Sequence, residues 1–394
     1  MKTGMPMKET YRALNGLRFF AAIAVVFFHY MPEVTGFEHL PKVLRNLVQC
    51  GPIALGFFFI LSGFVLASSY RDRALDSSGA RRAFWLARFA RLYPIYLVAY
   101  IFFAPIALQK YVLHPTLLSH AAEVETFFSA GFLSLLMIQA WTHLSQAWNG
   151  PSWSLSVEAF FYVIFPFVAA RLMRMRTLFA GMLCVALWLT LVSIAIANGR
   201  GVIPHAIYNA YFGNSPLLWT PAFFIGIALF RFAAPWQKVS RLRADGAALL
   251  ATAAILLICA FFPGDSKEVL ISGALFPFLA LAILAYSHQS SWFSRIMGAT
   301  PLFRLGEVSY ITYIMQAPLW HYFHFATNGL AHRSPTAKEV SAWQFWSFLP
   351  FLILASFALS VFVERPVRAW ILSGRRKPET SLSAPNVEIL QEIG

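Results

Sequence analysis

The first apolar segment of the chain reads Gly16-Leu17-Arg18-Phe19-Phe20-Ala21-Ala22-Ile23-Ala24-Val25-Val26-Phe27-Phe28-His29, and every side chain between Arg18 and His29 is hydrocarbon. A spacing of eleven residues makes roughly three helical turns plus 20°, so a helix here carries both polar side chains on one face, roughly 16 Å apart along the axis. Ionisable groups inside an apolar helix are costly and usually face a bundle interior. The segment predicts a spanning helix in which His29 has a function. The alternative is an arginine at headgroup level and a histidine satisfied by a neighbouring helix.

The composition is that of a membrane protein throughout. Hydrophobic residues make up 58% of the chain and charged residues 12%, whereas a soluble domain has about 25% charged residues. Segments of roughly 20 residues that could span a bilayer lie at 16–36, 50–69, 92–110, 153–170, 177–197, 215–233, 246–263, 269–287, 308–327 and 343–363. The sequence predicts an all-α, polytopic bundle of about ten spanning helices.

The distribution of basic residues predicts the orientation of this bundle. If the weaker apolar run at 126–141 is re-entrant or interfacial and the N-terminus is cytoplasmic, most of the 31 lysines and arginines fall in cytoplasmic segments, as the positive-inside bias requires. We therefore expect a cytoplasmic N-terminal segment at 1–15, a transmembrane domain at 16–373 and a flexible cytoplasmic tail at 374–394. Both termini are then cytoplasmic, and the protein is expected in the cell (inner) membrane.

The net charge of +14 follows from this orientation, because basic loops lie beside anionic lipid. It indicates contact with the bilayer and no nucleic-acid partner. The cysteines at 50, 184 and 259 have no paired spacing, so neither a disulfide framework nor a metal site is expected.

A second informative stretch precedes the third apolar segment. Arg88 and Arg91 lie three residues apart, so on a helix their guanidinium groups point the same way and could bind one phosphate or pyrophosphate. A cytosolic phosphorylated donor is the expected ligand. The alternative is a pair of snorkelling residues that only enforce orientation.

A third stretch places an acid inside a spanning segment. Glu158 lies five residues after Trp153, about 8 Å below the expected outer boundary and at a depth similar to that of His29. We therefore predict a dyad in which Glu158 stabilises the imidazole while His29 takes a proton from a hydroxyl. The alternative is a structural partner for another buried donor.

The order of these motifs is similar to that of the acyltransferase type 3 family of bacterial integral-membrane O-acyltransferases. The resemblance covers about 12–368 and rests on Leu14-Asn15-Gly16-Leu17-Arg18 with His29, Gly56-Phe57-Phe58-Phe59-Ile60-Leu61-Ser62-Gly63-Phe64, Arg88-x-x-Arg91-x-Tyr93-Pro94, Trp153-Ser154-Leu155-Ser156-Val157-Glu158, Leu305-Gly306-x-x-Ser309-Tyr310-x-x-Tyr313 and Glu364-Arg365-Pro366. It implies transfer of an acyl group, usually acetyl from acetyl-CoA, to a hydroxyl of a surface or secreted glycan or, in some members, a macrolide. It also implies that the Arg18/His29 and Arg88/Arg91 pairs match two functional pairs of that family.

Together, the residues and the resemblance give one hypothesis for the site. The donor, acyl-CoA, binds Arg88, Arg91 and Arg18, and no metal takes part. His29, Glu158 and Arg18 are the catalytic candidates. His29 acts either as a base in direct transfer or as a nucleophile that carries the acyl group. The expected substrate contacts are Trp153, Tyr310 and Tyr313.

Other polar residues are weaker candidates. Ser62, Ser154 and Ser156 are conceivable acyl carriers, although small residues of this kind more often serve helix packing. The segment 110–152, rich in histidine and tryptophan, could help to bind a sugar through its aromatic faces, although tryptophan also anchors helices at interfaces.

Three positions depart from the family pattern. Asn15 stands where Asp is usual, Ala159 where a second Glu often follows, and Gln316 where many members have His. Glutamine cannot act as a base, so the role of that histidine is lost or passes to His321 or His324. Many relatives also carry an SGNH-type esterase domain, so we expect any partner for that step to be a separate periplasmic or extracellular protein.

A different class of function also fits an intramembrane arginine, histidine and glutamate. A proton-coupled transporter or a lipid-linked glycan exporter shows such residues. The sequence has no internal repeat, which argues against a carrier, and the paired arginines favour a phosphorylated donor. Consumption of acyl-CoA in detergent discriminates between the two classes.

Overall fold

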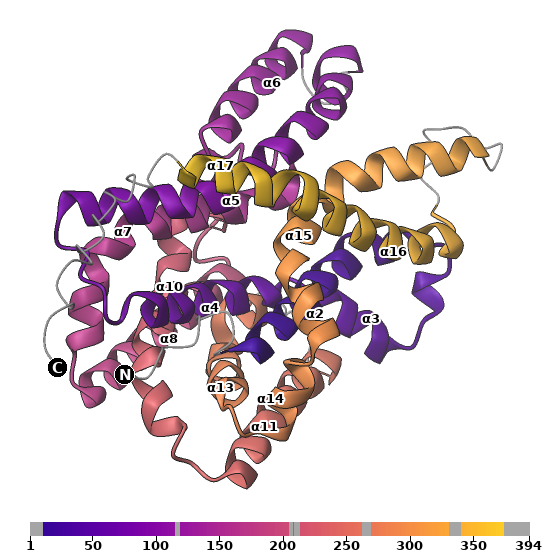
Figure 1. Ribbon diagram of the computed structural model, residues 1–394. Helices are drawn as coiled ribbons and strands as arrows, with labels where there is room; N and C mark the ends of the chain where they lie inside the picture. The colour runs from indigo at the N-terminus through magenta and orange to yellow at the C-terminus, as the bar shows by residue number, and fades with distance from the viewer. Residues whose placement is uncertain are drawn as a thin grey trace, which may run out of the picture.

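The computed structural model describes residues 11–114, 119–204, 208, 213–261, 269–330 and 340–373, which form helices joined by turns (Figure 1). Within these ranges the one β-type contact is an isolated bridge between Val34 and Val340. The helices are α2 Arg12–Tyr30, α3 Lys42–Gln49, α4 Ile53–Tyr70, α5 Ser78–Leu108, α6 His120–Leu135, α7 Trp153–Arg174, α8 Thr177–Gly199, α10 Pro216–Trp236, α11 Arg241–Phe261, α13 Phe276–Ser287, α14 Trp292–Met297, α15 Thr300–Leu330, α16 Ala342–Leu359 and α17 Arg365–Ser373. The prediction of an all-α fold is confirmed.

Eight helical stretches in the described part of the chain are long and apolar enough to cross a membrane. They are Arg12–Glu33, Ile53–Tyr70, Ser78–Leu113, Gly150–Arg174, Thr177–Gly199, Pro216–Trp236, Arg241–Phe261 and Ala342–Ser373. These eight correspond to eight of the predicted spans. The protein is therefore a multi-pass helical bundle of the membrane type.

The two remaining predicted spans differ from the eight. Residues 269–287 contain a π-helical turn with Gly273 at φ 150° and then the 12-residue helix α13. Residues 308–327 lie in α15, which has 31 residues and is long enough to cross but is less apolar. The count of ten spans and the cytoplasmic position of both termini stay predictions.

The segment predicted to be re-entrant or interfacial is broken into two pieces. Helix α6 ends at Leu135, Met137 adopts a left-handed φ of 57°, and a short 3-10 turn follows at Gln139–Trp141. α6 projects from the top of the bundle in Figure 1 and exposes Phe128 and Phe132. It is not among the eight apolar spans.

Helices α4 and α10 form the centre of the bundle. In the most apolar part of each helix, the buried share is 61% for α4 and 50% for α10, but only 17% for α8. The central pair approaches closely because glycine faces backbone on both sides: a Cβ on Gly63 would collide with the carbonyl of Phe223, and one on Gly226 with that of Ile60. Such small-residue contacts are the usual means of tight helix packing in membranes.

Helices α2 and α15 form a second close pair that positions the site. They lie side by side in Figure 1, and a Cβ on Gly306 would collide with the backbone of Asn15. This contact explains the glycine in the motif at Leu305-Gly306. It holds the face of α2 that carries Arg18 and His29 against α15.

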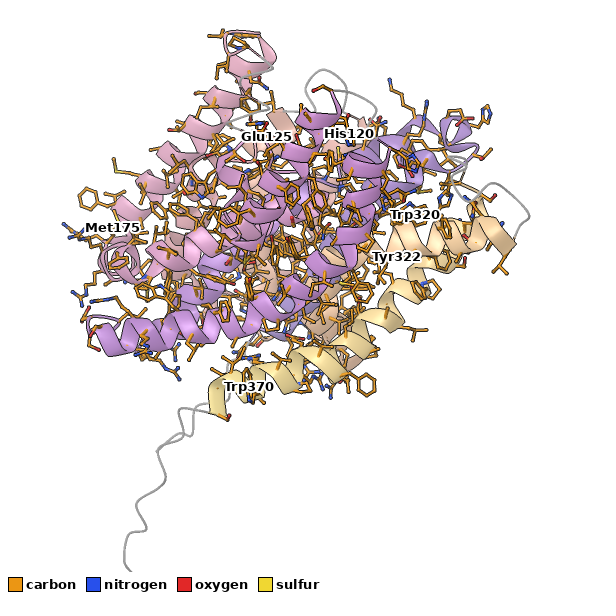
Figure 2. All side chains as sticks on the ribbon, turned by 90° about the horizontal axis from the view of Figure 1, so that it is seen from above. His120, Glu125, Met175, Trp320, Tyr322 and Trp370 are labelled. Atoms are coloured by element: carbon orange, nitrogen blue, oxygen red, sulfur yellow. The ribbon has the colours of Figure 1, made fainter. Side chains whose placement is uncertain are left out.

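The periphery of the bundle is strongly apolar. Leu178, Phe362 and Trp370 are 73%, 76% and 76% exposed, and Figure 2 shows Trp370 at the outer edge of the molecule. Many large exposed apolar side chains of this kind suit contact with lipid. Most of the predicted N-terminal segment and all of the predicted tail at 374–394 lie outside the described residues.

Candidate active site

Three guanidinium groups from two helices converge on one side of the bundle. Arg18 of α2 and Arg88 and Arg91 of α5 line two adjoining cavities of about 740 and 1240 Å³. Both cavities also share Leu61 and Val65 of α4. We call the two together the arginine pocket. The structure thus brings the three predicted donor-binding arginines to one place.

The arginines of this pocket are suited to an anion. The Arg88 guanidinium lies 5.9 to 6.0 Å from the rings of Tyr70, Phe84 and Tyr162, which support it by cation–π contact. The Nε atoms of Arg18 and Arg88 are buried and have no hydrogen-bond partner within the described residues. A buried charged donor without an acceptor is unfavourable, so an anionic ligand would stabilise the pocket.

Glu158 belongs to the arginine pocket. It lies on α7, one helical turn before Tyr162, and its carboxylate accepts a hydrogen bond from the Tyr162 hydroxyl. Glu158 lines the same cavity as Arg18 and is among the charged groups that act on that guanidinium. The carboxylate therefore balances part of the positive charge of the pocket.

His29 faces a different cavity. Its Nδ1 lies 3.2 Å from Oε1 of Gln316, and the ring lines a cavity that is open to solvent, with an empty space of about 2350 Å³ that includes the solvent at its mouth. We call this the histidine cavity. Its other lining residues are mostly aromatic or polar and include Glu33, Phe103, Lys110, Trp148, Trp153, Tyr208 and Trp219.

The structure does not bring Glu158 and His29 together as the predicted dyad. The imidazole pairs with Gln316 and the carboxylate with Tyr162, and the two groups line different cavities. The reason is that Glu158 lies beside Arg18, which precedes His29 by eleven residues on α2. The carboxylate is therefore near the level of Arg18, about three helical turns from that of the imidazole.

Tyr313 lies where the two cavities meet. Both Leu55 and Tyr313 line the arginine pocket and the histidine cavity. The Tyr313 hydroxyl is 2.8 Å from Ser154 Oγ and 2.9 Å from the carbonyl oxygen of Pro151. This hydrogen-bonded group and Leu55 lie at the junction of the two cavities.

The predicted substrate-contacting residues are divided between the cavities. Trp153 lines the histidine cavity, and Tyr310 lines the arginine pocket with its hydroxyl donating to the carbonyl of Leu92 at 2.6 Å. Tyr313 contributes to both. A ligand in the histidine cavity would therefore meet Trp153 and Tyr313 but not Tyr310.

The remaining histidines of α15 have different surroundings. His321 lines the histidine cavity, with its Nδ1 3.2 Å from the carbonyl of Ala317. His324 stacks on Trp320 at 5.5 Å between ring centroids, which is a packing arrangement. Within the described residues, no group of three His, Cys, Asp or Glu could hold a metal ion.

The segment 110–152 contributes part of the histidine cavity. Lys110, His114, Gln146 and Trp148 line it. His120 and Glu125, which belong to α6, lie together near one edge of the molecule in Figure 2 and are not lining residues. Trp148 is therefore the tryptophan of this segment that lines the cavity, and its ring also stacks on Tyr100.

Comparison with known proteins identifies the family. A family model described as an acyltransferase domain matches residues 11–365. The chain belongs to the acyltransferase type 3 family. It is thus an enzyme that transfers acyl groups other than amino-acyl groups, and the transporter alternative is set aside.

Three relatives show how this acyltransferase compares in length. Acyltransferase MdmB of Streptomyces mycarofaciens is 28% identical over 400 residues, which cover 95% of each chain. YrhL of Bacillus subtilis, named as a candidate peptidoglycan O-acetyltransferase, is 26% identical over 90% of this chain and 54% of its own. O-acetyltransferase OatA of Staphylococcus aureus is 24% identical over 78% of this chain and 49% of its own. The chain spans about half the length of the last two relatives, and no solved structure matches it.

The acyltransferase has pocket residues that the sequence analysis did not select. Arg365 and Arg368 of α17 line the arginine pocket together with Arg88 and Arg91. Arg365 and Arg368 have the same Arg-x-x-Arg spacing as Arg88 and Arg91, so a second arginine pair was visible in the sequence beside the motif at Glu364. Gln316 was recognised only as the loss of a histidine, because a contact across helices leaves no mark in a single sequence.

Proposed function

We propose that this acyltransferase moves an acyl group of acetyl size from acyl-CoA in the arginine pocket to a hydroxyl of a glycan in the histidine cavity. The observation that carries the proposal is the pair of cavities that meet at Tyr313 and Leu55, one lined by arginines and the other by His29. A transfer reaction between two substrates needs two such binding sites within reach of one another.

The donor side is supported by charge. Coenzyme A carries a diphosphate and a 3′-phosphate, and planar guanidinium groups bind phosphates through two parallel hydrogen bonds. Arg88 and Arg91 supply one such pair and Arg18 lies deeper in the same pocket. With the arginine pocket on the cytoplasmic side, as the positive-inside bias favours, the pocket opens where acyl-CoA is made.

The acceptor side is supported by size and aromatic character. The histidine cavity, at about 2350 Å³, is larger than either part of the arginine pocket, and Trp148 and Trp153 line it. Aromatic rings with a few polar groups are typical of ligand-binding cavities. The names of the YrhL and OatA relatives, both O-acetyltransferases, also favour a hydroxyl acceptor, with peptidoglycan as the named case.

His29 is the proposed base. Its Nε2 takes the proton of the acceptor hydroxyl while the oxygen attacks the thioester carbonyl. The tetrahedral intermediate then expels the coenzyme A thiolate, and the imidazolium returns the proton to give free thiol and an ester. In the second route, Nε2 itself attacks the thioester, and the acceptor hydroxyl later cleaves the acyl-imidazole.

The test is turnover by the purified protein in detergent with radiolabelled acetyl-CoA and glycan acceptors. Release of free CoA together with labelled acceptor is expected. The double variant Arg88→Ala/Arg91→Ala should raise the KM for acetyl-CoA by roughly 10-fold or more, because charge-assisted hydrogen bonds are lost. Arg243→Ala, at an exposed position of α11, is the matched control. No release of CoA from any acyl-CoA would contradict the proposal.

A further inference from the structure

The side chain that contacts His29 is an amide of fixed orientation. Gln316 on α15 is 0% exposed, and its Nε2 donates to the carbonyl oxygen of Tyr313 at 2.8 Å. Because a carbonyl oxygen only accepts hydrogen bonds, the nitrogen end of the amide must face Tyr313. The oxygen end, Oε1, then faces Nδ1 of His29 at 3.2 Å.

We infer that Gln316 is a positioning residue that holds His29 in the tautomer protonated at Nδ1. An amide oxygen accepts but cannot donate, so Nδ1 must carry the proton in this contact. The unprotonated nitrogen of a neutral imidazole is then Nε2, which is the ring nitrogen left for the histidine cavity. In Ser-His-Asp and Cys-His-Asn sites, the carboxylate or amide likewise holds the histidine in one tautomer and orientation.

A second acceptor lies beside the same ring. The backbone of Val25, one turn earlier on α2, also interacts with the imidazole as a hydrogen-bond acceptor. Removal of Gln316 therefore leaves the imidazole with a backbone acceptor but without the side-chain oxygen that faces Nδ1, and the ring becomes free to rotate.

A purely structural role for Gln316 makes different predictions. In that case the amide only satisfies buried polar groups, and its loss lowers stability without changing the state of the imidazole. The other titratable groups around the cavity are Glu33, Lys110, His114 and His321, with the phenols of Tyr30, Tyr208 and Tyr313. None of them is altered in the variants below, so their contribution to a pH profile stays constant.

The inference rests on the proposed function, and its first test does not depend on turnover. The ring 15N chemical shifts of His29, assigned by their loss in His29→Ala, report the tautomer of the neutral imidazole directly. Wild type should be protonated at Nδ1, and Gln316→Leu should show a mixture of tautomers. Predominant protonation at Nε2 in wild type, or unchanged shifts in Gln316→Leu, would overturn the inference.

The second test compares kcat and kcat/KM against pH. Gln316→Leu should lower kcat roughly 10- to 100-fold, which is a partial loss of the roughly 100- to 10,000-fold that a positioned general base contributes, with the KM for acetyl-CoA little changed. Gln316→Glu keeps the acceptor and adds a charge that favours the imidazolium. Activity depends on the neutral imidazole, so the acid limb of its kcat/KM profile should move to higher pH while kcat stays above that of Gln316→Leu.

Asn328→Leu is the matched control, because Asn328 is a fully buried amide on the same helix that contacts His324. The acid limb of the kcat/KM profile of Asn328→Leu should coincide with that of wild type. A wild-type pH profile in both Gln316 variants would contradict the positioning role. If Gln316→Leu does not fold, the Gln316→Glu profile alone decides. If wild type itself does not consume acyl-CoA, the proposed function fails, and the 15N shifts still decide the inference.

Discussion

Arg18 and His29 extend from the same helix, yet each lines its own cavity. Spacing predicts that Arg88 and Arg91 act as a pair, and spacing together with the family resemblance predicts that Arg18 belongs to the same basic site. Spacing could not reveal that His29 contacts Gln316, because that contact joins α2 to α15. Tyr162 lies four residues after Glu158 on α7, so the spacing of this pair is visible in the sequence, but spacing does not show that Glu158 contacts Tyr162 and not His29.

The first prediction concerns Glu158. Since its carboxylate lies in the arginine pocket and bonds Tyr162, Glu158→Gln should leave the acid limb of the kcat/KM profile at its wild-type pH. The kinetic change should fall on the KM for acetyl-CoA, because the charge balance beside Arg18 is altered. Steady-state kinetics at a series of pH values measure both kcat/KM and the KM for acetyl-CoA. A clear displacement of the acid limb in Glu158→Gln would contradict this prediction and support a dyad of Glu158 and His29.

At the scale of the helices, the length of an apolar run predicts most spanning helices correctly, but it does not predict where a helix ends. Eight predicted spans match long apolar helices because a spanning helix must bury all its backbone polar groups within one continuous apolar run. The run at 269–287 is similar in hydropathy, yet it contains Gly273 at φ 150° and a helix of only 12 residues. A local backbone conformation of that kind is chosen by the packing around it, which a hydropathy pattern does not contain.

The second prediction belongs to the crossing of α4 and α10. Gly226→Ala places a methyl group against the carbonyl of Ile60, so it should lower the stability by about 1–3 kcal/mol, as overpacking of a core does. Gly246→Ala is the matched control, because a methyl group on Gly246 of α11 would meet nothing within 4 Å and should be neutral or stabilising by roughly 0.5–1 kcal/mol. Thermal unfolding in detergent measures both. Equal shifts of the two midpoints would contradict the packing argument.

At the scale of the whole molecule, the two cavities and the charge distribution define an axis. The arginine pocket lies at the end of the bundle where α2 begins, and the histidine cavity lies toward its C-terminal end. The positive-inside bias assigns the arginine end to the cytoplasm. Donor and acceptor would then enter from opposite sides of the membrane and meet beside Tyr313.

The third prediction tests that orientation. In a background without the native cysteines, Gly79→Cys at the start of α5 and His120→Cys at the start of α6 mark the two ends at exposed positions. A membrane-impermeant maleimide should label His120→Cys in intact cells, and Gly79→Cys only after permeabilisation. The reverse pattern would turn the bundle over and place the arginine pocket away from cytosolic acyl-CoA.

The most direct measurement of the proposed transfer is the release of free CoA from acetyl-CoA by wild type and by His29→Ala, with transfer of label to acceptor followed in the same reaction. Loss of the base predicts a fall in kcat of roughly 100-fold or more with acetyl-CoA binding retained in the arginine pocket. His39→Ala is the control, since the side chain of His39 is 84% exposed and contacts the carboxylate of the neighbouring Glu38, and this variant should turn over like wild type. Wild-type turnover by His29→Ala would contradict the role of His29 as the base.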